Sequence, residues 1–485
     1  MYRNRFSSAL ALAALAAILL PSFLPAQITF QRTYGGIGDD RGFSVRQTAD
    51  GGYIIAGQTS IFEGSNTDVY LIKTDSLGDT LWTRTFGGDS NDFGFSVRQT
   101  TDSGYIISGK TSSFGAGNED VYLIRTNSNG DTLWTKTFGG DSNDCGPSVQ
   151  VTADGGCIIT GYTRSFGMGQ ADVYLVKTDI HGDTMWTRTY GGTGNDNGYS
   201  VQQTVDDGYI IAGNARSPSS YDVYLVKTDA GGDTLWTRTY GSTGSEGGRS
   251  IQQTTDTGYI IVAPTTSFGA ESSDVYLIKT DARGDTQWTR TFGGRSVDQG
   301  FSVQQTTDGG YIVGGLTASN GSYPSDAWLI KTGADGSAMW TRTFGDGPYD
   351  EGRSVQQTAD GGYVVTGLTR SFGVVENDVY LIKTDSLGNV AVAEPKANPT
   401  RAPALSLTCE PNPCRGATRV SFTPTTSSSK PLTLRMYDSQ GRMVLSREVS
   451  TSSFPLSTSD LPAGAYFIRC EISGEHATAR VVLQR

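Results

Sequence analysis

Carboxylate side chains recur in this 485-residue chain at a spacing that could gather them into rings. One acidic residue stands at the same position of seven successive repeats: Asp40, Asp92, Asp144, Asp196, Glu246, Asp298 and Asp350. A second aspartate recurs further along each repeat: Asp68, Asp120, Asp172, Asp222, Asp274, Asp326 and Asp378. Carboxylate oxygens gathered at one rim could bind Ca²⁺ or a polyhydroxyl ligand. Alternatively, each carboxylate caps a turn or pairs with a repeated base such as Lys73 or Arg84, because a residue found in every repeat usually serves the shared fold.

Nucleophilic and zinc chemistry have little support, because the chain holds only two histidines. His181 falls in a predicted turn and His476 lies near the C-terminus, so we expect neither a Ser-His-Asp arrangement nor a zinc site. The turn Asp75–Asp79 has the composition of a calcium loop but lacks its ligand spacing, and Asp and Gly favour hairpin turns for backbone reasons. We predict no cofactor, with Ca²⁺ left open. A glycosidase pair of carboxylates is also left open, although no single acidic cluster breaks the repeat symmetry.

Aromatic residues mark the places where the repeats differ. Five repeats carry a loop phenylalanine: Phe62, Phe114, Phe166, Phe268 and Phe372. The fourth repeat has Tyr221 in a shortened loop, and the sixth has Tyr323. Such rings could stack on sugars, or the phenylalanines could fill the gaps between repeats. We predict that the first carboxylate ring, with Tyr221 and Tyr323, forms the ligand-binding surface.

The elements that must position these residues follow from a regular tryptophan spacing. Trp82, Trp134, Trp186, Trp236, Trp288 and Trp340 follow one another at 50 or 52 residues, and Phe30 stands one period upstream. A period of this length containing several short strands is typical of propeller blades. We therefore predict an all-β, seven-bladed β-propeller over residues 27–392. Both carboxylate rings would lie in loops on one face of it.

Each copy contains four strand signals separated by Asp/Gly turns, which indicates an antiparallel four-stranded sheet. The last copy stops after Thr384 without a tryptophan strand, and a matching strand stands alone at Ile28–Gly35. We expect this N-terminal strand to complete the seventh blade, so that only short, protected edges remain.

The two ends of the chain have a different character. Residues 1–26 combine Arg3 and Arg5 with the apolar run Ala9–Leu20, which predicts a secretory signal peptide. Residues 393–404 read as a linker, and residues 405–485 as a small Ig-like β-sandwich. The formal net charge of −11, or −13 without the two signal arginines, argues against nucleic-acid binding. No further apolar run is long enough to predict a membrane span.

The C-terminal segment resembles the type A sorting domain of the type IX secretion system. The resemblance rests on Pro411–Thr418, Leu434–Arg442, Leu461–Phe467 and a basic-ended last strand through Arg485. It implies export across the outer membrane by the type IX machinery, followed by surface attachment or release. The pairing of Cys409, Cys414 and Cys470 is left open.

The repeats are similar to quinoprotein-type propellers through Thr74–Trp82 and Gly87, although their turn is one residue shorter. That family usually has eight blades, and no adjacent cysteine pair is present here, so quinone binding is not expected. We predict a non-catalytic binding or adhesion propeller, secreted or at the cell surface, whose partner is an extracellular glycan or a matrix protein. The alternatives are a carbohydrate-active hydrolase and a structural surface-layer component; ligand identity and oligomeric state are left open.

Overall fold

The computed structural model describes residues 27–36, 38–60, 66–217, 220–269, 271–320, 324–372 and 376–390, together with the strands of the C-terminal segment between 405 and 483. All regular structure in these ranges is β-strand, and none of it includes a helix long and apolar enough to cross a membrane. The chain divides into two compact units, residues 1–393 and 394–485. The predicted signal peptide and linker lie outside the described residues.

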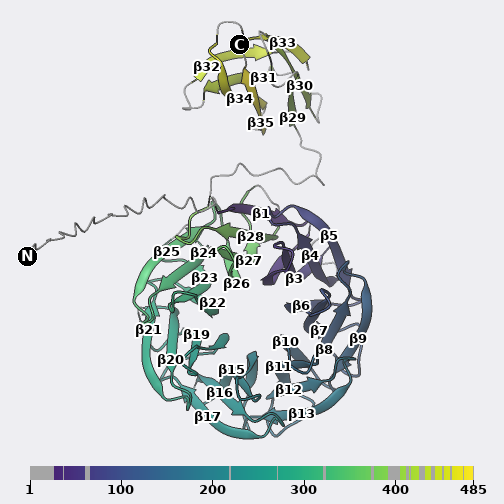
Figure 1. Cartoon of the computed structure of the whole chain (residues 1–485), viewed down its shortest axis with the longest axis vertical. Helices are drawn as coiled ribbons and strands as arrows, with labels where there is room; N and C mark the ends of the chain where they lie inside the picture. The colour runs from purple at the N-terminus through teal and green to yellow at the C-terminus, as the bar shows by residue number, and fades with distance from the viewer. Residues whose placement is uncertain are drawn as a thin grey trace, which may run out of the picture. The chain divides into compact units, whose positions relative to one another are not determined.

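Seven antiparallel four-stranded sheets surround a central channel, which confirms the predicted seven-bladed propeller (Figure 1). The inner strands are β2 (Arg41–Gln47), β6 (Asp92–Gln99), β10 (Asp144–Val151), β14 (Asn197–Gln203), β18 (Ser250–Gln253), β22 (Asp298–Gln305) and β26 (Glu351–Gln357). The second strands are β3 (Tyr53–Ser60), β7 (Tyr105–Thr111), β11 (Cys157–Thr163), β15 (Tyr209–Arg216), β19 (Tyr259–Thr265), β23 (Tyr311–Thr317) and β27 (Tyr363–Thr369).

The third strands are β4 (Thr67–Thr74), β8 (Asp120–Thr126), β12 (Asp172–Thr178), β16 (Tyr221–Thr228), β20 (Asp274–Thr280), β24 (Asp326–Thr332) and β28 (Asp378–Thr384). The outer strands are β5 (Thr80–Phe86), β9 (Thr132–Phe138), β13 (Thr184–Tyr190), β17 (Thr234–Tyr240), β21 (Thr286–Phe292), β25 (Ala338–Phe344) and β1 (Phe30–Tyr34).

The ring closes through its N-terminal strand, as the repeat pattern predicts. Strand β1 pairs antiparallel with β28, with Phe30 opposite Lys383 and Tyr34 opposite Val379. The Tyr34 hydroxyl donates to the Gly78 carbonyl of the first blade at 2.6 Å, which ties the last sheet to the first. The seventh blade therefore contains both ends of the propeller sequence.

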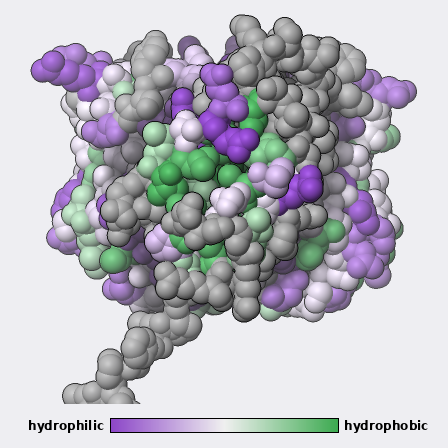
Figure 2. Space-filling view, turned by 90° about the horizontal axis from the view of Figure 1, so that it is seen from above, coloured by the Kyte–Doolittle hydropathy of each residue, from purple (hydrophilic) through white to green (hydrophobic). Residues whose placement is uncertain are grey.

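The core lies between adjacent blades, because the middle strands are apolar on both faces. Between the first two blades, Ile54 and Leu71 pack against Val97 and Ile107, and all four are fully buried. Burial of one such side chain contributes about 1.5–3 kcal/mol. Trp82 packs edge-on against Tyr105 of the next blade, with ring centroids 5.9 Å apart. Figure 2 shows both hydrophilic and hydrophobic residues among the described residues at the surface.

The C-terminal unit contains two antiparallel sheets that share one hydrophobic core. One sheet consists of β29 (Leu405–Glu410), β30 (Ala417–Pro424) and β33 (Ser453–Ser457). The other consists of β32 (Met443–Val449), β31 (Leu432–Asp438), β34 (Gly464–Ile472) and β35 (Glu475–Leu483). Cys409 and Cys414 are buried free thiols, and burial raises the pKa of Cys409 to about 11. The side chain of Cys470 is not among those described.

Candidate functional site

The two carboxylate rings lie at the same end of the blades and meet in pairs at the blade junctions. Within one blade, Asp92 and Asp120 both stand opposite Thr111, which places the two rings at one rim. Between blades, a Cβ at Gly87 would lie 2.1 Å from Asp68 Oδ1 and 2.7 Å from Asp92 Oδ2. A carboxylate of one blade therefore adjoins a carboxylate of the next, and only glycine fits between them.

The first ring is buried and holds the loops of its own rim. Its seven members, the predicted binding residues from Asp40 to Asp350, are at most 4% exposed. Asp92 Oδ2 accepts hydrogen bonds from the Gly88 N–H at 2.9 Å and the Ser113 hydroxyl at 2.6 Å. Such bonds satisfy turn N–H groups that would otherwise lack a partner. The ring thus performs the turn-capping function, and direct ligand contact by it stays a prediction.

Carboxyl groups of the acidic rim have raised pKa values. Burial, with a smaller contribution from the Asp40 carboxylate, raises the pKa of Asp378 to about 7. Burial likewise raises the pKa of Asp40 and of Asp350 to about 6. These groups carry protons at a pH where exposed carboxyls have lost them.

The repeated bases pair with other carboxylates. Lys73 is buried and its ammonium group binds Asp50 at 2.9 Å, at the opposite end of the blade. Arg84 reaches Asp131 of the next blade at 3.3 Å. In the turn resembling a calcium loop, Asp75 Oδ1 accepts backbone N–H bonds at 2.9 Å. Each of these three carboxylates, Asp50, Asp131 and Asp75, therefore has a contact that stabilises the fold.

The loop phenylalanines pack on their own blades and stay partly exposed. Phe114 lies against Tyr122 with ring centroids 5.7 Å apart, and 45% of Phe114 is exposed. Phe166 and Phe372 repeat this arrangement at 46% and 39% exposure. Predicted site residue Tyr221 begins β16 and is half-buried, with the Arg216 guanidinium over its ring. Tyr323 and Phe62 lie outside the described residues.

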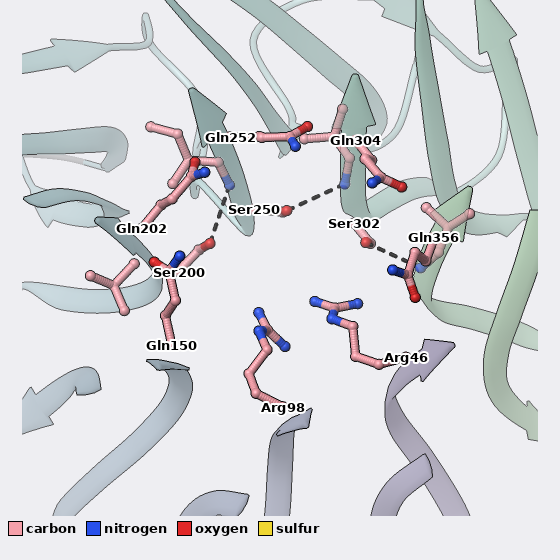
Figure 3. A pocket seen from close by; sticks show the side chains of 14 residues that line it. Arg46, Arg98, Gln150, Ser200, Gln202, Ser250, Gln252, Ser302, Gln304 and Gln356 are labelled. Atoms are coloured by element: carbon pink, nitrogen blue, oxygen red, sulfur yellow. Dashed lines mark hydrogen bonds between the residues drawn. The ribbon is translucent and has the colours of Figure 1, made fainter. Parts of the chain in front are cut away.

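A cavity of about 250 Å³ occupies the central channel, lined by serine, glutamine and arginine side chains (Figure 3). The inner strands are sheet edges, so alternate N–H groups along them need partners from outside their own sheet. Seven serine hydroxyls meet this need by accepting a bond from the next inner strand, at 3.2–3.4 Å: Ser44, Ser96, Ser148, Ser200, Ser250, Ser302 and Ser354.

A second ring two residues further along meets the same need with glutamine. Five glutamines of this ring each accept, at Oε1, a hydrogen bond of 2.5–2.8 Å from a backbone N–H of the next inner strand: Gln150, Gln202, Gln252, Gln304 and Gln356. The first two blades carry Arg46 and Arg98 instead, and guanidinium groups can only donate. The Gln99 and Val151 N–H groups, which face these arginines in the ring order, receive no side-chain acceptor from any described residue. Two of seven positions therefore lose an inter-blade bond.

The two guanidinium groups point into the channel from neighbouring strands β2 and β6 (Figure 3). Each Nη1 donates to the carbonyl of the preceding valine at 2.8 Å, which orients the group. Neither arginine forms an ion pair with a described carboxylate. Desolvation lowers the pKa of Arg46 to about 10, and desolvation with the nearby Arg46 charge lowers that of Arg98. Arg46 still carries its charge at neutral pH.

This basic pair lies far from the acidic rim. Arg46 stands near the end of β2, six residues after Asp40, which directly precedes that strand; at about 3.3 Å per residue this is a distance of roughly 20 Å. Our sequence predictions, which centred on the acidic rim and the aromatic loops, missed both arginines. Their signal is one residue: the first two repeats read S-V-R-Q-T, with arginine at the position where the other five repeats carry glutamine.

Comparison with known proteins identifies the C-terminal unit. Residues 411–484 match the family described as the secretion system C-terminal sorting domain, which confirms the predicted type IX sorting domain. The protein is therefore secreted to the cell surface. A regulatory protein from Caulobacter vibrioides, FlaEY, is 27% identical over 254 residues, which is 48% of this chain. The match covers 22% of FlaEY, about a fifth of its length.

Solved structures resemble the chain at low sequence identity. PorZ, a surface component of the type IX secretion system of Porphyromonas gingivalis, is 11% identical with a TM-score of 0.42, over 93% of this chain and 60% of PorZ. An ulvan lyase bound to -[GlcA(1-4)Rha3S]- is 10% identical with a TM-score of 0.46, over 73% of this chain and 96% of the lyase.

Proposed function

We propose that the propeller is a non-catalytic binding or adhesion module, which the sorting domain delivers to the cell surface and which engages an extracellular glycan or matrix protein. The observation that carries the proposal is the chemistry of the central cavity. Hydroxyl, amide and guanidinium groups line it, and no carboxylate, histidine or thiol is among its lining residues. Such groups recognise polar ligands by hydrogen bonding, and without a carboxylate or histidine among the lining residues the serine hydroxyls have no base there to activate them as nucleophiles.

The cavity lining is held rigidly, which favours binding. Each lining glutamine is fixed by a bond to the next inner strand, as in the contact between Gln202 and the Gln253 N–H at 2.6 Å. Serine hydroxyls of the same strands repeat this, as between Ser200 and the Ile251 N–H at 3.3 Å. Groups fixed before the ligand arrives lose little freedom on binding. The ligand thus meets preformed donors.

The burial of the acidic rim also favours a non-catalytic propeller. A glycosidase needs two carboxylates that both reach the substrate. In the paired carboxylates at the blade junctions, such as Asp68 and Asp92, one partner is fully buried and bonded to its own turn. The pairs also repeat round the ring, whereas an active site is a single place.

The test is a screen of the secreted protein, residues 27–485, on immobilised glycans and extracellular matrix proteins. We expect saturable retention on a subset of them. No retention on any of these surfaces would contradict the binding module and favour the structural surface-layer component. Turnover of a polysaccharide, abolished by replacing one acidic residue, would instead establish the hydrolase.

A further inference from the structure

The five glutamines of the channel ring present hydrogen-bond donors to the cavity. Each Oε1 accepts a backbone N–H of the neighbouring blade, as Gln252 does from Gln305 at 2.5 Å. This bond settles which end of the amide is oxygen, because a flipped amide would place two donors together. The NH₂ groups are left for the cavity. With the guanidinium groups of Arg46 and Arg98, the whole ring consists of donors.

The two arginines lack a counter-charge. They stand at adjacent positions of one ring and repel each other, and none of the described carboxylates forms an ion pair with either. No acidic residue lines the cavity. Half-buried charge of one sign is unfavourable unless an opposite charge accompanies it. In a chain of net charge −11, with many carboxylates elsewhere, this positive spot is a local exception.

The arginines also replace residues that would strengthen the ring. Glutamine at either position would accept the N–H of the next strand, as it does in the other five blades. Arginine leaves the Gln99 and Val151 N–H groups without that acceptor. Positions where a structural bond is given up are characteristic of functional sites.

We infer that Arg46 and Arg98, with the glutamine amides around them, bind an oxyanion: the carboxylate, sulfate or phosphate group of an acidic ligand. Guanidinium groups bind such groups through two parallel N–H···O bonds. The cavity of about 250 Å³ holds one such group with several waters, each water occupying about 30 Å³. This inference rests on the proposed binding function and specifies the charge of the ligand.

The experiment is calorimetric titration of the secreted chain with sulfate, inorganic phosphate and glucuronate, in a low-salt buffer free of other oxyanions, with glucose as the neutral counterpart. The test variant is R46Q/R98Q, which introduces the residue that five blades already carry. The control is R188Q/R238Q, which removes two partly exposed arginines of the outer strands, paired with Asp233 and Asp285, and changes the net charge equally.

For the unmodified protein we expect saturable binding of at least one oxyanion and none of glucose. R46Q/R98Q should bind at least tenfold more weakly, and R188Q/R238Q within twofold of the unmodified protein. Binding of glucuronate points to a sugar acid, whereas binding of sulfate or phosphate alone points to a sulfated or phosphorylated group or the free ion.

Absence of saturable oxyanion binding, or equal binding by R46Q/R98Q, would overturn the inference. Its failure is distinct from that of the proposed function. A glycan or matrix protein retained equally by R46Q/R98Q leaves the binding module intact and removes the oxyanion site. Oxyanion binding without retention on any immobilised surface supports the oxyanion site and contradicts the proposed adhesion function.

Discussion

Replacing Asp378 with asparagine should stabilise the protein, and by more at pH 8 than at pH 5. Asp378 opens β28 and adjoins Asp40 across Gly35, where the last blade meets the first. Burial and the Asp40 carboxylate raise the pKa of Asp378 to about 7. Asparagine has nearly the shape of a protonated aspartate and cannot ionise, so it removes the repulsion at the seam.

The sign follows from proton binding. An unfolded aspartate has a pKa of about 3.9, so between roughly pH 4 and pH 7 the folded state binds more protons than the unfolded state. Stability therefore falls as pH rises through this window, and the full penalty is present above about pH 7. A difference of about three pKa units corresponds to about 4 kcal/mol at most, and on the order of 2–4 kcal/mol after local relaxation.

Urea unfolding at pH 5, 6, 7 and 8 measures the effect. The difference in unfolding free energy between D378N and the unmodified protein should be on the order of 1 kcal/mol at pH 5, where the unfolded carboxyl group has ionised and the folded one has not, and should grow steadily to pH 8. Asp281→Asn is the control, because Asn127 occupies the equivalent turn of the second blade and supports it. A difference that does not change with pH, or a D378N protein that is less stable at pH 8, would refute the electrostatic reasoning.

Three further outcomes follow from the same contacts. R46Q/R98Q should gain the two missing hydrogen bonds, from the Gln99 and Val151 N–H groups, and its free energy of unfolding in oxyanion-free buffer should rise by about 1–3 kcal/mol. A lower urea midpoint would contradict the expectation that glutamine accepts these two N–H groups. Phe30→Ala should cost about 3–5 kcal/mol by urea unfolding, because Phe30 is buried in the closing blade; a loss below 1 kcal/mol would show that β1 is dispensable. Melting temperatures in Ca²⁺ and in EDTA should agree, since no group of three or more acidic, histidine or cysteine ligands occurs in the described residues; a rise with Ca²⁺ would assign a cation to the acidic rim.

The blade count and the closure could be predicted because both depend on periodicity. Five of the six outer-strand tryptophans, such as Trp82, pack on a tyrosine of the next blade, so the packing contact repeats with the sequence. Trp134 packs against a cluster that has Cys157 at the tyrosine position. Phe30 occupies the same place against Tyr53, with ring centroids 5.9 Å apart. The first copy has an extra strand before it and the last copy lacks its outer strand, so the extra strand can complete the last sheet. Local pattern and global pairing therefore agree.

The pairing of the two carboxylate rings could not be predicted, because it depends on how one blade sits against the next. Asp68 and Asp92 are separated by an entire outer strand in sequence and meet only across Gly87. Their burial also depends on the conformation of the rim loops, which the sequence repeat does not predict. Sequence reasoning placed both rings on one rim, but it could not show that the rim is a row of buried pairs.

Arg46 and Arg98 could be recognised as functional candidates only from the hydrogen bonds that the other blades repeat. In the sequence they are single substitutions, less conspicuous than a shortened loop carrying Tyr221. Their meaning appears only when Gln150 and its counterparts are seen to accept the N–H groups of the neighbouring strand. A departure from a repeat that leaves every contact intact is neutral variation, whereas one that removes a bond and adds an uncompensated charge requires a reason outside the fold. At this position the reason that the chemistry supports is a negatively charged ligand.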